Sequence, residues 1–97
     1  MHRIFTHPRA EQDLLDIWLY TFDKWGERQT DAYIDELNAI LQILAEQPLM
    51  CRERTEFTPP VRIHHHAQHL VVYLALNNGI NVIRVLHESM EVGEHVE

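Results

Sequence analysis

Four side chains in the second half of the chain could perform acid–base chemistry: Arg62, Tyr73, Arg84 and His87. Cleavage of RNA without a metal needs three groups: a proton acceptor for the 2′-hydroxyl, a cation for the developing charge, and an acid for the leaving oxygen. These four residues are the only set in the sequence that fits those roles. They are therefore our candidates for a catalytic or toxic surface.

The spacing of the candidates weakens the catalytic interpretation. Arg84 and His87 are three residues apart, so on a regular strand they point to opposite faces of a sheet. The acid–base pair is then split unless a β-bulge intervenes. Arg62 lies between two apolar residues and should face away from both.

A structural interpretation of the same residues stays open. Arg62 and Arg84 could pair with Glu56 or Glu88, and His87 could cap a strand end through a backbone hydrogen bond. For His87 we favour the structural role, because a single titratable residue in a strand usually reports packing. For the two arginines, sequence does not separate the roles.

A histidine cluster invites a metal-binding interpretation: His64, His65, His66 and His69. Imidazole suits zinc, copper or nickel, and His64 and His66 would share one strand face. A structural zinc site usually needs four ligands, and no cysteine or suitably spaced aspartate joins this cluster. We predict a polar turn between two strands and no metal or cofactor.

The charge distribution argues against general nucleic-acid binding. The chain has 15 acidic and 8 basic residues and a net charge of −7, and its only lysine is Lys24. Most of the acidity falls within residues 10–47. Nucleic-acid coating depends on clustered lysine and arginine, which this chain lacks. We therefore expect no direct specific nucleic-acid binding.

Other features indicate a cytoplasmic protein. The longest apolar run, residues 70–76, is far shorter than the ~20 residues that a membrane span needs. The N-terminus has no apolar signal core. Cys51 is the only cysteine, so no internal disulfide can form. We expect one domain over residues 1–97, in a reducing cytoplasm.

Periodicity predicts two helices. Pro8 fits a first helical turn with Thr6 or His7 near the cap, and Gly26 ends the helix. Its predicted core stripe consists of Ala10, Leu14, Ile17, Trp18, Thr21 and Trp25. A second helix over residues 27–47 should return antiparallel to the first and form a hairpin.

The pattern then changes to the two-residue period of strands. Strands are predicted at 61–64, 69–76 and 80–87, with a hairpin turn at 77–79 and one more strand at 4–6. The acidic tail, 91–97, is predicted not to pack. The order β-α-α-β-β-β indicates an α+β fold with a helical hairpin on a twisted antiparallel sheet.

Residues 4–90 also resemble the ParE toxins of bacterial type II toxin–antitoxin systems, within the ParE/RelE superfamily. The matching pieces, in order, are Ala10-x-x-Asp13-Leu14-x-x-Ile17-x-x-Tyr20-Thr21, Trp25-Gly26-x-x-Gln29, Tyr33, Leu44-Ala45-x-x-Pro48, Val61-Arg62, Tyr73, Ile83-Arg84-Val85-Leu86-His87 and Met90. The resemblance implies the RelE/ParE-like fold and a toxin neutralised by a ParD-like antitoxin.

The same resemblance implies that the target is DNA gyrase and that the toxin acts by binding gyrase, not by catalysing a reaction. The alternative is a RelE-like ribosome-dependent mRNA endoribonuclease, since related toxins share the fold and fold does not settle activity. A third possibility is an inactive remnant that only binds its antitoxin.

A second apolar stripe on the first helix points to a partner. Leu15, Leu19 and Phe22 lie 120–180° around the helical wheel from Ala10. A small domain can bury only part of its apolar surface, so a second stripe favours an interface. We predict that the antitoxin packs on these three residues.

Overall fold

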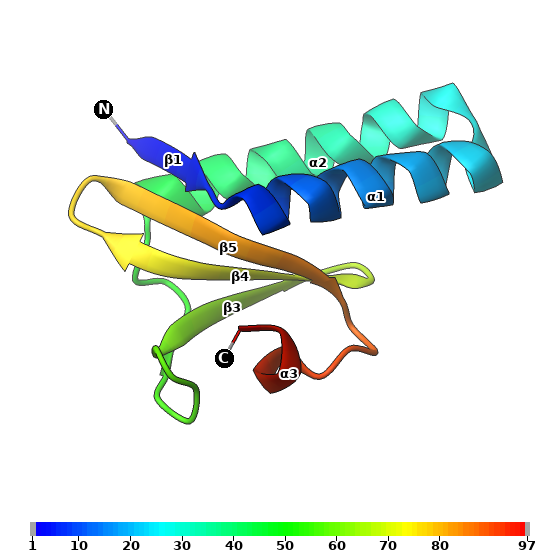
Figure 1. The fold of residues 1–97 in the computed structure, drawn as a ribbon. Coiled ribbons are helices and arrows are strands. Elements are labelled where there is room, and N and C mark those ends of the chain that lie inside the picture. The colour runs from blue at the N-terminus through cyan, green and yellow to red at the C-terminus, as the bar shows by residue number, and fades with distance from the viewer. Residues whose placement is uncertain (1, 97) are drawn as a thin grey trace.

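The computed structural model describes residues 2–96. Its elements are β1 (Arg3–Thr6), α1 (Pro8–Trp25), α2 (Glu27–Glu46), β2 (Glu53–Arg54), β3 (Val61–His66), β4 (His69–Leu76), β5 (Gly79–His87) and α3 (Val92–Val96). They follow the predicted order with two short additions, β2 and α3, that were not predicted. The two long helices form a hairpin that lies across one face of the sheet (Figure 1). The predicted α+β fold class is confirmed.

Local chemistry explains the bounds of the hairpin. The Nδ1 atom of His7 accepts a hydrogen bond from the Arg9 backbone at 3.0 Å, which caps α1 ahead of Pro8. Gly26 separates the helices with a φ of 82°, a backbone conformation that favours glycine. In the first turn of α2, the Thr30 hydroxyl donates to the Gly26 carbonyl at 2.8 Å.

The sheet has five strands in the order β1-β5-β4-β3-β2, and it is mixed rather than wholly antiparallel. β1 pairs with β5 in parallel, whereas the other neighbours are antiparallel. The prediction missed this because short turns set the direction of β3, β4 and β5, but more than half the chain separates β1 from β5. Gly79 lies opposite Arg3, where a Cβ atom would collide with the Arg3 carbonyl.

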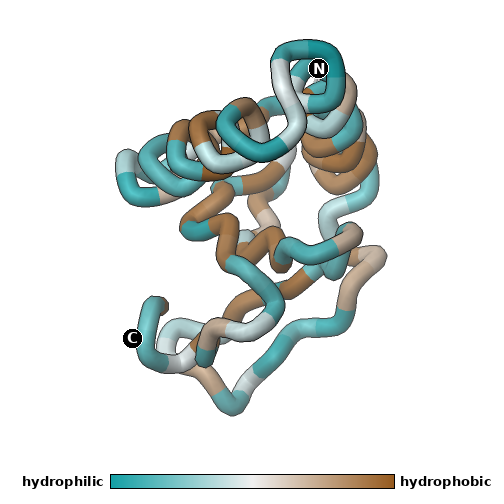
Figure 2. Tube along the Cα trace, turned by 90° about the vertical axis from the view of Figure 1, so that its right-hand side faces the viewer, coloured by the Kyte–Doolittle hydropathy of each residue, from teal (hydrophilic) through white to brown (hydrophobic). Residues whose placement is uncertain are grey.

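Side chains on the two faces of the sheet form two separate cores. The face under the hairpin contributes Val71, Tyr73, Ile80, Val82 and Val85 to a cluster with buried residues of α1 and α2. Hydrophobic segments gather on the strands and on the helix turns that face them (Figure 2).

The opposite face of the sheet is covered by the C-terminal segment. Val92 and Val96 of α3 pack against a cluster that includes Val72 and Leu86. The prediction that residues 91–97 do not pack was therefore wrong for Val92 and Val96, while Glu97 lies outside the described residues. The acidic composition hid a valine pair four residues apart, which forms one face of a helical turn.

The hairpin is offset along the sheet, and its tip projects past the end of the sheet (Figure 1). As a result, part of the predicted core stripe of α1 has no sheet beneath it. Ala10 and Ile17 are buried as predicted, but Trp18 is 36% exposed and Trp25, at the tip, is 62% exposed. No helix among residues 2–96 combines the length and hydropathy needed to cross a membrane.

Candidate functional site

Arg62 and Tyr73 lie opposite each other on adjacent strands and are both engaged within the fold. The Tyr73 side chain is fully buried, and its hydroxyl donates to the Pro48 carbonyl at 3.0 Å. Burial raises the pKa of Tyr73 far above its usual value. Arg62 donates to the Cys51 carbonyl instead of pairing with a glutamate. Both side chains thus hold the segment that links α2 to the sheet.

Arg84 pairs with Asp13, not with Glu56 or Glu88 as the sequence suggested. Its guanidinium makes two bonds to the carboxylate, at 2.7 and 2.9 Å, and a third to the His95 carbonyl at 3.3 Å. Only 16% of the Arg84 side chain and 13% of the Asp13 side chain are exposed. Asp13 raises the pKa of Arg84, because a bidentate ion pair favours the charged form.

Asp13 also completes the edge of the sheet. The pairing of β1 with β5 ends at Val82, so beyond that point β5 has a strand neighbour only on its other side, where β4 lies. The Asp13 carboxylate accepts a hydrogen bond from the Val85 N–H at 3.0 Å, in the place a neighbouring strand would occupy. One carboxylate therefore ties α1 to both the backbone and a side chain of β5.

β5 contains a bulge, but it lies just before Arg84 and not between Arg84 and His87, so these two side chains stay on opposite faces of the sheet. Val72 pairs with Arg84 and the next residue, Tyr73, pairs with Val82, so Ile83 is an extra residue in β5. His87 and Val85 line a large cleft under the hairpin, whereas Arg84 lines a smaller hollow of about 310 Å³ with Arg9. Nδ1 of His87 accepts from the Ser89 backbone at 3.1 Å, the strand-end cap that the sequence suggested.

The histidine cluster is divided among separate contacts. His64 approaches the Cys51 sulfur at 3.8 Å, His65 meets Glu88 at 2.9 Å, and His66 stacks on Tyr33. Burial lowers the pKa of His64. Within residues 2–96, no three histidine, cysteine or acidic side chains gather as a metal would need.

The second stripe of α1 lies on the surface, as the helical wheel predicted. Leu15, Leu19 and Phe22 are 49%, 52% and 44% exposed. Phe22 stacks on Trp18 with ring centroids 5.1 Å apart, which extends the stripe by one aromatic side chain. Apolar residues therefore cover the outer face of a helix whose inner face is already packed on the sheet.

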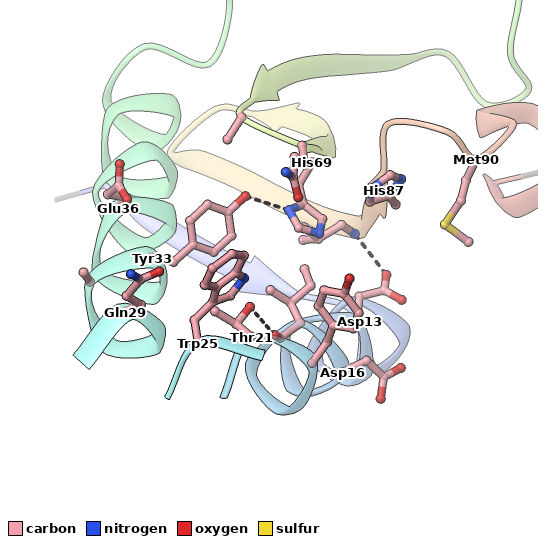
Figure 3. A pocket seen from close by; sticks show the side chains of 16 residues that line it. Asp13, Asp16, Thr21, Trp25, Gln29, Tyr33, Glu36, His69, His87 and Met90 are labelled. Atoms are coloured by element: carbon pink, nitrogen blue, oxygen red, sulfur yellow. Dashed lines mark hydrogen bonds between the residues drawn. The ribbon is translucent and has the colours of Figure 1, made fainter. Parts of the chain in front are cut away.

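The structure adds a cleft that the sequence did not predict. It has a volume of about 890 Å³ and lies where the projecting hairpin overhangs the β3–β4 turn and the end of β5. Trp25, Tyr33, His69 and His87 can be followed around it in Figure 3. The lining residues are Asp13, Asp16, Ile17, Tyr20, Thr21, Trp25, Gln29, Ala32, Tyr33, Glu36, Ala67, Gln68, His69, Val85, His87 and Met90.

Tyr33 and His69 form the polar centre of the cleft. The Tyr33 hydroxyl and Nδ1 of His69 are hydrogen-bonded at 2.6 Å, and the His87 ring meets His69 edge-on with centroids 5.8 Å apart. Burial and the nearby Glu36 raise the pKa of Tyr33. Burial, with a smaller contribution from His87, lowers the pKa of His69, so its ring is neutral at pH 7.

Comparison with known proteins identifies the family. The sequence model of the ParE toxin of the type II toxin–antitoxin system parDE matches residues 4–92. This chain belongs to the ParE toxin family. It is 35% identical over 88 residues to Toxin ParE1 of Caulobacter vibrioides, covering 91% of each chain. It is 33% identical over 95 residues to Toxin ParE1 of Mycobacterium tuberculosis, covering 97% of each.

Solved structures show the same fold. A chain of the chromosomal ParDE system from P. aeruginosa superposes with a TM-score of 0.73 at 15% sequence identity, covering 90% of this chain and 96% of the other. The predicted membership of the family and its α+β fold are thus confirmed. The protein is a ParE-type toxin of a type II toxin–antitoxin system.

Sequence reasoning missed the cleft for a specific reason. Trp25 lies on α1, Tyr33 on α2 and Met90 in the segment between β5 and α3, and Trp25 matched the predicted core stripe of α1. The lengths of the elements gave no signal, because helices of 18 and 20 residues at 1.5 Å per residue are about as long as strands of eight and nine residues at about 3.3 Å. The overhang depends on where the hairpin packs along the sheet.

Proposed function

We propose that this toxin is neutralised by a ParD-like antitoxin that packs on the outer face of α1, and that the free toxin binds and inhibits DNA gyrase in the cytoplasm. The observation that carries the antitoxin site is the exposure of Leu15, Leu19 and Phe22 on a helix already packed on its other side. Side chains spaced by four and three residues can be covered together by one partner helix.

Binding rather than catalysis is the better account of toxicity. Tyr73 is buried, and Arg62 and Arg84 donate to groups inside the fold. His87 is exposed but lies in a different hollow from Arg84. These contacts do not assemble the acid, base and cation of a nuclease. Gyrase as the target rests on the resemblance to ParE toxins. Arg62, Arg84 and His87 stay candidates for its contact surface, whereas the buried Tyr73 can act there only by positioning its neighbours.

The target is tested by expressing the toxin without antitoxin. Inhibition of gyrase should stop replication and give filamentous cells with an SOS response. Purified toxin should stabilise cleavage complexes in a supercoiling assay. Rapid arrest of translation with cut mRNA, and no effect on gyrase, would support the endoribonuclease instead; loss of both effects would indicate an inactive antitoxin-binding protein.

The antitoxin site is tested with Leu19→Ser. Fully burying a leucine contributes about 1.5–3 kcal/mol, so its loss should weaken antitoxin binding roughly tenfold or more. The variant should stay toxic yet escape neutralisation. Leu49→Ser is the matched control, because Leu49 is 71% exposed and lies outside α1. Normal binding by Leu19→Ser, measured by titration with the antitoxin, would place the antitoxin elsewhere.

A further inference from the structure

The cleft under the hairpin tip has the chemistry of a cation site. One acidic side chain comes from each helix, Asp16 from α1 and Glu36 from α2. Asp16 accepts a hydrogen bond from the neutral Gln12 side chain, and Glu36 lies 3.9 Å from His66, beyond hydrogen-bonding distance. Among residues 2–96, no lysine or arginine lines the cleft. The third carboxylate, Asp13, is neutralised by Arg84.

Aromatic rings accompany these carboxylates. Tyr20, Trp25 and Tyr33 all line the cleft, and Trp25 is 62% exposed. Lys24 already lies 5.5 Å from the centroid of the Tyr20 ring, so one of these rings attracts a cation within the toxin itself. His69 is neutral at pH 7 because its pKa is lowered, and it does not offset the carboxylates.

We propose that the cleft receives an arginine side chain of the antitoxin. Arginine is the residue that satisfies both features, because its planar guanidinium stacks on an aromatic ring while it binds a carboxylate through paired hydrogen bonds. Asp16 and Glu36 lie on opposite sides of the cleft in Figure 3, so the guanidinium binds one of them and the other adds to the attraction for its charge. The cleft adjoins α1, whose outer face is the proposed apolar contact, so one antitoxin chain can reach both. This inference rests on the proposed function and adds a charged contact to it.

The position of the charge is what makes the proposal specific. The acidity of residues 10–47 would by itself attract any basic partner over a Debye length of about 8 Å in physiological salt. A site in the cleft predicts that Asp16 and Glu36 contribute to the affinity for the antitoxin, while other exposed carboxylates of the hairpin do not. Asp23 on α1 and Glu27 on α2 serve as the control pair, because both are exposed and neither lines the cleft.

The experiment compares two double variants with the same loss of charge. Asp16→Asn with Glu36→Gln removes the cleft carboxylates, and Asp23→Asn with Glu27→Gln removes the control pair. We expect the cleft variant to bind the purified antitoxin roughly 10- to 100-fold more weakly, with a flatter dependence on salt. The control should change affinity by about twofold or less. Circular dichroism melts should show that both variants fold like the wild type.

A second arm identifies the arginine. Each arginine of the antitoxin is replaced by glutamine and titrated against the wild-type toxin and the cleft variant. One arginine replacement should weaken binding of the antitoxin to the wild-type toxin. The same replacement should cause little further loss of affinity for the cleft variant, because that variant already lacks the carboxylates that the arginine binds. Independent effects for every arginine would overturn the proposal.

The outcomes separate this proposal from the proposed function. If the cleft variant binds like the wild type, or both double variants lose affinity equally, the cleft site is wrong while the antitoxin contact on α1 stands. If Leu19→Ser binds normally but the cleft variant is weakened, the cleft is supported and the α1 contact is wrong. If the wild-type toxin does not bind the antitoxin at all, both are wrong.

Discussion

Two groups of predicted site residues in this toxin differ in how far the fold buries and engages their side chains. Arg62, Tyr73 and Arg84 look chemically active in the sequence, yet each is hydrogen-bonded inside the fold. Leu15 and Leu19 are of the apolar type that usually fills a core, yet they are about half exposed, as the second stripe of the helical wheel predicted. The difference teaches that in a domain this small, polar groups can hold the layers together while apolar groups are left for a partner.

The largest effect on stability is expected for Arg84→Ala. The variant leaves the Asp13 carboxylate, 13% exposed, without its cation. Breaking a buried pair in this way costs about 3–5 kcal/mol, which lowers Tm by roughly 10 °C or more in a domain of this size. Thermal denaturation measures the fall in Tm, and Arg9→Ala is the control because Arg9 is exposed. Lost toxicity with an unchanged Tm would make Arg84 a toxic-surface residue instead.

A smaller loss is expected for Tyr73→Phe. The substitution removes the hydroxyl that donates to Pro48 and leaves that carbonyl without this partner. We expect a loss of about 1 kcal/mol and a fall in Tm of roughly 4–8 °C. Tyr20→Phe is the control, because Tyr20 is 61% exposed. An unchanged Tm together with lost toxicity would show that the Tyr73 hydroxyl acts at the target.

Stability should also fall in mild acid. The pKa of His69 is lowered from 6.5 in the folded state, so just below pH 6.5 the unfolded chain binds more protons than the folded one. The free energy of unfolding therefore decreases as pH falls from 6.5 through the folded-state pKa. Denaturant titrations between about pH 7.5 and 5 should show a flatter slope for His69→Gln than for the exposed control His2→Gln. Equal slopes would mean that His69 does not contribute.

The smallest change in stability is expected for Leu19→Ser, the variant with the large effect on antitoxin binding. Because Leu19 is half exposed, the free energy of unfolding of the Leu19→Ser variant should stay within about 0.5 kcal/mol of the wild-type value. Leu37→Ala in α2 is the contrast, since Leu37 is 1% exposed and its truncation should cost about 2–5 kcal/mol. If the Leu19→Ser variant does not fold, Leu19 contributes to the stability of the fold as the buried polar residues do, and the contrast between the two groups is wrong.

The sequence by itself determined the two long helices, the strands other than β2, and the family. Pro8, Gly26 and the turn at 77–79 mark boundaries that the structure reproduces, because caps and turns depend on a few neighbouring residues. The family match over residues 4–92 agrees with the motif pieces read along the chain. The exposed stripe of α1 was predictable too, since a helical wheel needs only a period.

Tertiary structure alone decided which groups meet. The bond between Asp13 and Arg84 joins residues 71 positions apart, and no local pattern selects that partner over a nearer glutamate. The parallel direction of β1 and the packing of α3 depend on which edge or face the rest of the fold leaves open. The cleft exists because the hairpin tip extends past the sheet, and that offset is set by the packing of whole layers.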